Sequence, residues 1–259
     1  MLSNSTQGPI DRADAAAVQN FLRTRARSGT QVGPFSILFS ADDPSPFANY
    51  AVPMDDAQPN AAEVAALEEA FRVRKRQPRL EYVPAAAPAV EGALAAAGFS
   101  VEMRPPLMTR RANATARKPE PKGFDFRFVE ANEHLAEAVR VGAEAFGGDE
   151  ADAQWLMGAV RRGGRVLVAY GQETGEAAGV GAFIRPLGGV TEVVGIGVRP
   201  AFRRQGLAQA ITSTLAEAAF ASGCCLAFLS AAGEAQSSIY ARAAFVRQSP
   251  MLFISKSRN

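Results

Sequence analysis

The stretch from Thr191 to Ala208 constrains the fold of this chain more than any other part of the sequence. Its first half alternates like a β-strand, Pro200 interrupts the pattern, and apolar residues at helical spacing follow. A helix that begins soon after a strand leaves free backbone N–H groups at the positive end of its dipole. Gly206 and Ala208 keep side chains away from an approaching anionic group, and Arg203 adds positive charge beside it. The stretch therefore predicts a main-chain cradle for a pyrophosphate.

Strand and helix patterns alternate along the second half of the chain. Expected strands span residues 124–129, 165–170, 179–184, 190–198, 224–229 and 251–255, and expected helices span 132–146, 150–161, 207–218 and 236–243. The first half carries a shorter series, with strands at 47–52 and 80–83 and helices at 64–71 and 89–97. A polar segment broken by prolines, residues 110–123, separates the halves. We therefore expect two domains, residues 1–116 and 123–259, joined by a linker at 117–122.

The two halves share a pattern at a constant spacing of 146 residues. Adding 146 to Leu80–Val83 gives Leu226–Leu229, and adding it to Gly98-Phe99 gives Ala244-Phe245. Pro105-x-Leu107 matches Pro250-x-Leu252 after a slip of one residue. A strand, a helix end and a following strand in one register indicate a duplication, and chance matching of two alanine-rich halves is the alternative.

Composition excludes several kinds of chemistry. The 28 Lys and Arg residues nearly balance the 26 Asp and Glu residues, so no strong electrostatic field favours nucleic acid. His134 is the one histidine of the chain, which excludes a two-histidine zinc site, and no Gly-Lys-Ser/Thr phosphate loop occurs. No apolar run approaches the ~20 residues that cross a membrane. Cys224 and Cys225 are adjacent, which favours two reduced thiols and a cytoplasmic protein without a metal.

The motif residues give the chain a resemblance to the GNAT superfamily of N-acetyltransferases. In that family a strand of the form Glu-x-x-x-x-x-Val-x-Pro leads into Arg/Gln-x-x-Gly-x-Gly/Ala, which opens a helix and holds the pyrophosphate of acetyl-CoA. The residues at those places here are Glu192, Val198, Pro200, Arg203, Gly206 and Ala208. The resemblance extends from Phe124 to Ser255. It implies an α/β (α+β) fold with a GNAT-like mixed central sheet flanked by helices, in two tandem GNAT-like domains.

The same resemblance implies acetyl-CoA as the cofactor. The residues that it assigns to acetyl-CoA binding are Ile196, Gly197, Val198, Arg203, Arg204, Gln205, Gly206, Leu207 and Ala208. It assigns catalysis to Tyr240 and Glu192, and it implies direct attack of an amine on the thioester. Main-chain N–H groups near Ile196 to Val198 would stabilise the oxyanion, and Gly195 and Gly197 would leave room for a ligand against the strand.

Tyr240 and Glu192 each have a second interpretation. The family's second signature, Tyr-x-x-x-Gly-Phe, begins here at Tyr240, with Ala244 in the place of the glycine. Many members carry an asparagine seven residues before the tyrosine, where this chain has Gly233, which puts one contact to the pantetheine arm in doubt. Tyr240 would protonate the leaving thiolate, or it is a core aromatic with a satisfied hydroxyl. Glu192 would act as general base, directly or through water, or it is a solvated carboxylate at a strand end.

The first half lacks these features. Leu94 stands where the spacing of 146 places Tyr240, and the turn after Val52 carries Asp55 and Asp56 but no arginine or glycine. Carboxylates there would repel the phosphates of CoA. Residues 1–116 are therefore expected to form a degenerate, partial GNAT-like domain without a cofactor site, which packs against the catalytic GNAT domain and shapes its acceptor pocket.

The acceptor is the part of the function that the sequence constrains least. We expect an amine of a small molecule or a peptide, and neither a nucleic acid nor a membrane as partner. Asp149, Glu150 and Asp152 would suit a cationic amine, although acids at a helix start are an ordinary solvated feature. A non-catalytic acetyl-CoA-binding regulatory module and acyl transfer to a hydroxyl or thiol are the alternatives, and the oligomeric state stays open.

Overall fold

The computed structural model of the protein describes residues 12–26, 29–41, 43–114, 121–129, 132–150, 155–161 and 163–257. The chain divides into two compact units. Unit 1 combines residues 1–107 with residues 247–259, and unit 2 consists of residues 108–246. Each unit has its own mixed sheet flanked by helices, as the sequence predicted.

Unit 2 contains a seven-stranded sheet in the order β12-β6-β11-β10-β9-β8-β7. In that order the strands are β12 (Val246–Arg247), β6 (Leu107–Arg111), β11 (Leu226–Ser230), β10 (Val190–Val198), β9 (Ala177–Phe183), β8 (Arg165–Gly171) and β7 (Phe124–Phe128). Neighbours from β7 to β10 are antiparallel, whereas β10 and β11 are parallel. All seven residues of β9 are buried, which explains why this strand reads as an apolar run without alternation.

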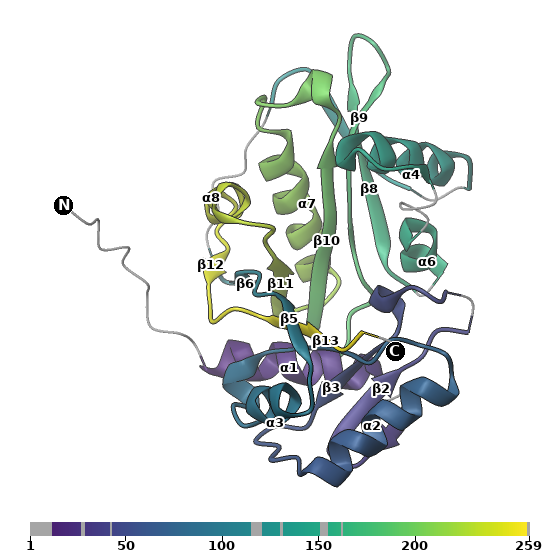
Figure 1. Ribbon diagram of the computed structural model, residues 1–259. Coiled ribbons are helices and arrows are strands. Elements are labelled where there is room, and N and C mark those ends of the chain that lie inside the picture. Colours follow the sequence, from purple (N-terminus) through teal and green to yellow (C-terminus); the bar gives the residue numbers. More distant parts are fainter. Residues whose placement is uncertain are drawn as a thin grey trace, which may run out of the picture. The chain divides into compact units, whose positions relative to one another are not determined.

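Helices cover both faces of the unit 2 sheet (Figure 1). α4 (Asn132–Phe146) and α6 (Trp155–Arg161) lie on one face, and their apolar side chains join Val166, Val168, Val180 and Ala182 in one core cluster. α7 (Leu207–Ala221) lies on the other face, where Ile211 and Leu215 pack with Val193 and Leu229 in a second cluster. α8 (Glu234–Arg242) follows β11. The sheet is therefore the middle layer of three.

Unit 1 contains a six-stranded sheet in the order β1-β2-β3-β4-β13-β5. Its strands are β1 (Thr30–Val32), β2 (Phe35–Leu38), β3 (Tyr50–Pro53), β4 (Arg79–Tyr82), β13 (Leu252–Ser255) and β5 (Ser100–Met103), and its helices are α1 (Arg12–Ala26), α2 (Ala61–Val73) and α3 (Val90–Ala96). Phe21, Phe35, Leu67, Phe71 and Leu252 are among the buried side chains of its core.

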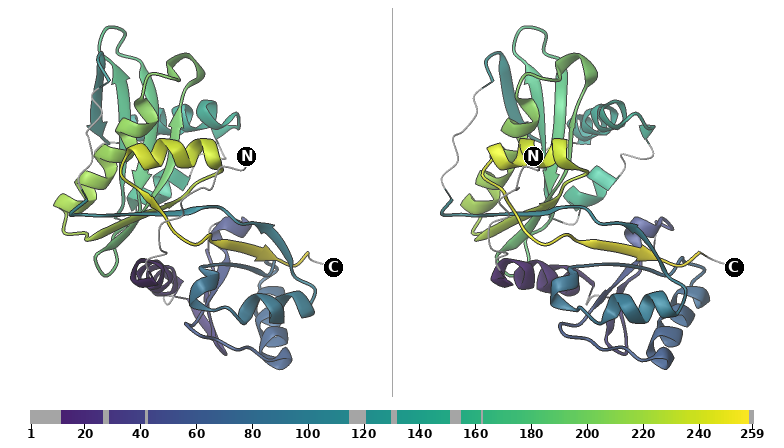
Figure 2. Two further views of the ribbon diagram at one scale, coloured as in Figure 1. Left: turned by 90° about the vertical axis from the view of Figure 1, so that its left-hand side faces the viewer. Right: turned by 60° about the vertical axis from the view of Figure 1, so that its left-hand side comes forward.

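Each sheet takes one strand from the other half of the chain. β6 comes from the first half and lies between β11 and β12 in unit 2, whereas β13 comes from the end of the second half and lies between β4 and β5 in unit 1. In Figure 2 the yellow arrow of β13 runs beside the teal strand β5. The prediction that a single break at 117–122 separates residues 1–116 from residues 123–259 is therefore wrong, because the chain passes between the units at 107/108 and again at 246/247. Residues 117–120 of that expected linker lie outside the described ranges.

The structure repeats its elements at the spacing found in the sequence. Adding 146 to Ala61, the first residue of α2, gives Leu207, the first residue of α7. Adding 146 to Ala96, the last residue of α3, gives Arg242, the last residue of α8. Adding 146 to Ser100, the first residue of β5, gives Val246, the first residue of β12. β6 and β13, which begin at Leu107 and Leu252, are equivalent after the slip of one residue. These matches support the duplication.

Several elements differ from the expectations. Residues 46–48, at the start of the strand expected at 47–52, form a 3₁₀ turn that begins with a proline, and β3 starts at Tyr50. α1, β1 and β2 were not predicted from the sequence. α1 contains many polar and charged residues, and β1 and β2 are only three and four residues long. α6 begins at Trp155, and residues 151–154 of the expected helix 150–161 lie outside the described ranges. None of the described helices combines the length and apolar character needed to cross a membrane.

Candidate functional site

The two parallel strands at the centre of unit 2 separate after a short paired stretch. β10 and β11 pair at Val190 with Leu226, Thr191 with Ala227 and Glu192 with Phe228. β10 then continues to Val198 and β11 to Ser230 with no further pairs in their register. Backbone groups of β10 beyond Glu192 on the β11 side are therefore available to a ligand that enters this fork.

A β-bulge lies in the part of β10 that extends beyond its pairing with β11. Val194 pairs with Ala182 and Gly197 pairs with Val180, so two residues of β10, Gly195 and Ile196, oppose a single residue of β9. Gly195 has a φ of 63°, a left-handed conformation that glycine adopts without strain. The bulge removes Ile196 from the regular ladder beside the fork, which is where the sequence predicted main-chain donors to an oxyanion.

The start of α7 is open. Gly206 is its N-cap residue with a φ of 80°, and no side chain caps the helix. The first bond of the helix runs from the N–H of Ala210 to the carbonyl of Gly206, which leaves the N–H groups of Leu207, Ala208 and Gln209 ahead of it. A Cβ added at Gly206 would meet no atom within 4 Å. The helix start therefore has open space beside Gly206, at the positive end of the helix dipole.

Arg203 is engaged with the main chain in this structure. Its Nε donates to the carbonyl of Val198 at 3.1 Å, and its Nη2 donates to the carbonyl of Ala145 at 2.9 Å. These bonds tie the turn to the end of β10 and to the last turn of α4. Arg204 has a left-handed φ of 65°, and it lies exposed beside Gln205. Both arginines are exposed, but Arg203 is held by two main-chain carbonyls and shapes the turn, and Arg204 lies next to the open helix start.

Gly197 has a different role from the one predicted. A Cβ at Gly197 would come within 2.8 Å of the Ala145 Cβ and 3.3 Å of the Phe146 ring. The missing side chain thus makes room for the last turn of α4 and not for a ligand, so that expectation is wrong for Gly197. The pairing of Gly197 and Val198 with β9 continues on the other edge of the strand.

Glu192 and Tyr240 belong to different faces of the sheet. Side chains alternate along a strand, so Glu192 shares its face with Val194, which packs in the cluster of α4 and α6. Tyr240, on α8, is half-buried and packs against the cluster of α7. No described residue hydrogen-bonds the Tyr240 hydroxyl. Burial raises the pKa of the Tyr240 phenol, so the group keeps its proton throughout the neutral range.

The equivalent places in unit 1 are closed by side chains. Asn60 stands 146 residues before Gly206 and caps α2, accepting from the Glu63 N–H at 3.0 Å while the Glu63 carboxylate accepts from the Asn60 N–H at 2.9 Å. The parallel strands β3 and β4 pair at Ala51 with Leu80. Beyond that pair, the fully buried Gln19 donates to the carbonyl of Pro53 at 2.9 Å and accepts from the N–H of Val83 at 3.0 Å. A side-chain amide thus joins the two strands where those of unit 2 stay apart.

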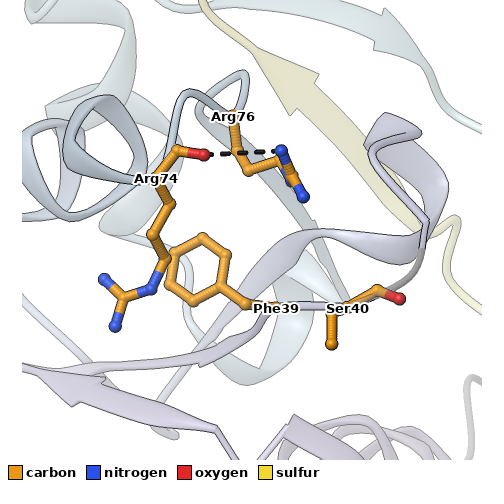
Figure 3. Close-up of a pocket in the computed structure, with 5 residues that line it drawn as sticks. Phe39, Ser40, Arg74 and Arg76 are labelled. Carbon is orange, nitrogen blue, oxygen red and sulfur yellow. Dashed lines mark hydrogen bonds between the residues drawn. The ribbon is translucent and has the colours of Figure 1, made fainter.

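A shallow cavity of about 290 Å³ lies in unit 1 and is lined by Phe39, Ser40, Ala41, Arg74 and Arg76. Figure 3 shows the guanidinium groups of Arg74 and Arg76 pointing apart, with Arg74 beside the Phe39 ring. None of the residues that the sequence predicted for catalysis or cofactor binding lines this cavity. Within the described ranges, no group of three His, Cys, Asp or Glu side chains could hold a metal ion.

The segment expected to face the acceptor is described only in part. Phe146 ends α4 with an exposed ring, and Asp149 and Glu150 follow on the surface. Asp152 lies outside the described residues. Glu144 and Arg199 were not predicted as site residues. Arg199, the residue after β10, donates two hydrogen bonds of 2.5 and 2.6 Å to Glu144 of α4. Their separation of 55 residues in the sequence gave no signal of the contact.

Comparison with known proteins agrees with this architecture. Residues 130–245 match the sequence model of the acetyltransferase (GNAT) family. A GCN5-related N-acetyltransferase from Kribbella flavida has a similar structure, with a TM-score of 0.77, 24% sequence identity, and coverage of 95% of this chain and 96% of that one. A GCN5-related N-acetyltransferase from Sphaerobacter thermophilus gives a TM-score of 0.66 at 14% identity over 95% of this chain and 90% of that one.

A tandem arrangement also has a structural counterpart. A tandem GNAT protein from the clavulanic acid biosynthesis pathway, in a form without AcCoA, gives a TM-score of 0.58 at 14% identity over 95% of each chain. No curated protein matches the chain. The similarity to these structures covers both units and shows that they share a fold with this chain.

Proposed function

The chain carries an acetyltransferase domain of the GNAT family over residues 130–245 and is an acyltransferase, and from this premise we propose that it transfers an acetyl group from acetyl-CoA to an amine of a small molecule or peptide. The observation that carries the proposal is the open start of α7 beside the fork between β10 and β11. An N-terminal helix end attracts a pyrophosphate, and the free edge of a strand can pair with an extended amide chain such as pantetheine.

The residues of the site fit acetyl-CoA. The N–H groups of Leu207 and Ala208 would bind the pyrophosphate, because Gly206 leaves the helix start without a side-chain cap. Arg204 would add a positive charge at the surface, with Gln205 next to it. Ile196, Gly197 and Val198 would contribute main-chain contacts along β10, and Arg203 would hold the turn in shape through its two carbonyl partners.

Bound acetyl-CoA would supply an acetyl group as a thioester. Glu192 would accept the proton that the amine nitrogen loses as its bond to the acetyl carbon forms. N–H groups at the bulge around Ile196 would stabilise the negative charge on the acetyl oxygen. Tyr240 would donate its proton to the sulfur as the carbon–sulfur bond breaks, and its raised pKa keeps that proton available. The products are an N-acetylated amine and the free thiol of CoA.

Unit 1 is proposed to be a degenerate repeat without a cofactor site. The Asn60–Glu63 capping box occupies the helix start, Gln19 joins the two strands of the fork, and buried Leu94 stands at the position of Tyr240. The two features that support acetyl-CoA binding in unit 2, and the candidate proton donor, are therefore each replaced in unit 1. A cytoplasmic location also belongs to the proposal, since Cys224 and Cys225 are free thiols.

The experiment that tests the function measures acetyl-CoA-dependent thiol release with amines, amino acids, aminoglycosides and peptides as acceptors. Release that depends on an amine, together with the N-acetylated product in the mass spectrum, is the expected result. Tight acetyl-CoA binding without transfer to any of these acceptors would indicate a regulatory module instead. Transfer to a hydroxyl or thiol would retain the acyltransferase class and replace the acceptor.

A further inference from the structure

Phe146 has an unusual position for a large apolar side chain. It is the last residue of α4, and its side chain is 61% exposed. The Cε2 and Cζ atoms of its ring lie 3.3 and 3.5 Å from the point where a Cβ of Gly197 would stand. The ring therefore lies over the main chain of β10 immediately after the bulge, with most of its surface facing solvent.

Contacts on both sides hold the last turn of α4 in this position. Glu144 accepts two hydrogen bonds from Arg199, at 2.5 and 2.6 Å, and this pairing lowers the pKa of the Glu144 carboxyl. The carbonyl of Ala145 accepts from Arg203. Three consecutive residues, 144 to 146, thus contact β10 or the turn before α7. A ring held in this way loses little conformational freedom when a ligand packs against it.

Phe146 and Glu192 lie on the same face of the sheet. Val194 packs in the cluster of α4 and α6, and Glu192 is two residues before it on the same strand. After the bulge, the α4-facing position passes to Gly197, where Ala145 and Phe146 make contact. An amine that gives its proton to Glu192 would approach from this face, on which the Phe146 ring lies over the part of β10 just after the bulge.

We propose that Phe146 is a specificity-determining residue that forms an apolar wall of the acceptor site, and that the acceptor is a primary amine carrying an aromatic or branched alkyl group. The inference rests on the proposed function and names its substrate class. A ring with most of its area exposed beside the bulge can pack against an apolar substituent of a bound ligand. The methylene chain of a polycationic amine covers less of the apolar area of the ring than an aromatic or branched alkyl group does.

The test compares two kinds of acceptor in the full-length protein. 2-Phenylethylamine and isoamylamine represent the proposed class, and putrescine and spermidine represent the polycations. Wild type is expected to acetylate the first pair with the higher kcat/KM. Phe146→Ala should lower kcat/KM for 2-phenylethylamine by about tenfold, mainly through KM, and change the value for putrescine by less than about twofold. Phe47→Ala, which removes a ring 68% exposed in unit 1, is the matched control and should leave both values unchanged.

A binding readout separates this inference from the proposed function. Isothermal titration of 2-phenylethylamine into protein saturated with CoA should show the same loss of affinity in Phe146→Ala, and Phe146→Leu should recover part of it with an unchanged melting temperature. If wild type acetylates the polyamines in preference, or if Phe146→Ala binds and acetylates 2-phenylethylamine as wild type does, the inference is overturned while acetyl transfer stands. Failure of acetyl-CoA itself to bind would overturn the proposed function and the inference with it.

Discussion

Gly98 and Ala244 occupy the same position in the two repeats, and both have left-handed backbones, with φ angles of 87° and 63°. Each follows the helix after the central parallel strand pair. The N–H of Phe99 donates to the carbonyl of Leu94 at 3.0 Å, and the N–H of Phe245 donates to the carbonyl of Tyr240 at 3.0 Å. This is the hydrogen bond that closes a Schellman motif, in which glycine is favoured. Ala244 therefore adopts, at a cost, a conformation that Gly98 adopts freely.

The pair predicts opposite effects of two reciprocal substitutions on stability. Ala244→Gly should raise the free energy of unfolding by about 1 kcal/mol because it removes the left-handed strain, and Gly98→Ala should lower it by about the same amount. A Cβ at Gly98 has the Lys256 side chain 3.8 Å away as its nearest neighbour, so packing does not obscure the comparison. Urea unfolding of both variants is the measurement. Shifts of the same sign in both would contradict the assignment.

Charge at position 206 should control acetyl-CoA binding. Asp and Asn both tolerate a left-handed backbone and have the same shape, so Gly206→Asp and Gly206→Asn differ only in charge. Calorimetric titration should give an affinity for acetyl-CoA at least about tenfold lower in the Asp variant than in the Asn variant, because the carboxylate repels the pyrophosphate. The difference should shrink in high salt.

Asn60→Gly provides the control in the other repeat. It removes the cap of α2 at the equivalent position and should leave acetyl-CoA affinity unchanged, with a loss of stability of a few tenths of a kcal/mol. Equal affinities in Gly206→Asp and Gly206→Asn would place the pyrophosphate elsewhere.

Tyr240→Phe tests the proton donor. The substitution keeps the ring in its cluster and removes the hydroxyl, so turnover should fall by roughly 10²–10⁴-fold if thiolate protonation limits the rate. Acetyl-CoA affinity and melting temperature should barely change. Because burial raises the pKa of Tyr240, wild-type turnover should not decline within the neutral pH range through loss of this proton. A stability loss with near-normal turnover would make Tyr240 a core aromatic.

Gln19 should be important for stability and not for binding. Gln19→Leu leaves the carbonyl of Pro53 and the N–H of Val83 without their partner in a buried place, which should lower the free energy of unfolding by about 2 kcal/mol. The stoichiometry of acetyl-CoA should remain one per chain in wild type and in the variant. A second equivalent bound by wild type would contradict the assignment of unit 1 as a repeat without a cofactor site.

The strand exchange predicts which fragment of the chain can fold. A fragment of residues 123–259 lacks β6 and carries β13 without its sheet, so it should aggregate through the unpaired edges of β11 and β12. A fragment of residues 105–246 contains every strand of the unit 2 sheet apart from the end of β12 and should be far more soluble. Sedimentation of both fragments after expression is the measurement. Equal solubility would show that β6 is dispensable.

The sequence predicted the local features well and the long-range ones poorly. The strand, turn and helix from Val190 to Ala221 follow from periodicity, from Pro200 and from Gly206, all of which act within a few residues. The repeat spacing also predicted equivalent helices correctly. The assignment of β13 to the second domain failed, because a strand pattern specifies buried faces but not the neighbouring strands.

The site residues also divide into those that local sequence identifies and those whose contacts are distant in the sequence. Gly206 could be assigned from its position before a helix, whereas the partners of Arg203 could not, since the carbonyl of Ala145 lies 58 residues away in the sequence. The sequence suggested that Gly197 leaves room for a ligand, whereas the last turn of α4 occupies the space that its side chain would fill. Gln19 carried no signal, because a single amide on a polar helix becomes meaningful only when two strands end beside it.

The position of β13 between β4 and β5 has a consequence for synthesis on the ribosome. β4 and β5 leave the ribosome early, but the strand that joins them is made after every strand of unit 2. Synthesis proceeds at about 5–20 residues per second, so the facing edges of β4 and β5 stay unpaired for on the order of ten seconds. The nascent chain therefore cannot complete the sheet of unit 1 before every strand of the unit 2 sheet has been made. Chaperones that shield strand edges during translation should raise the yield of this protein more than those that act after release.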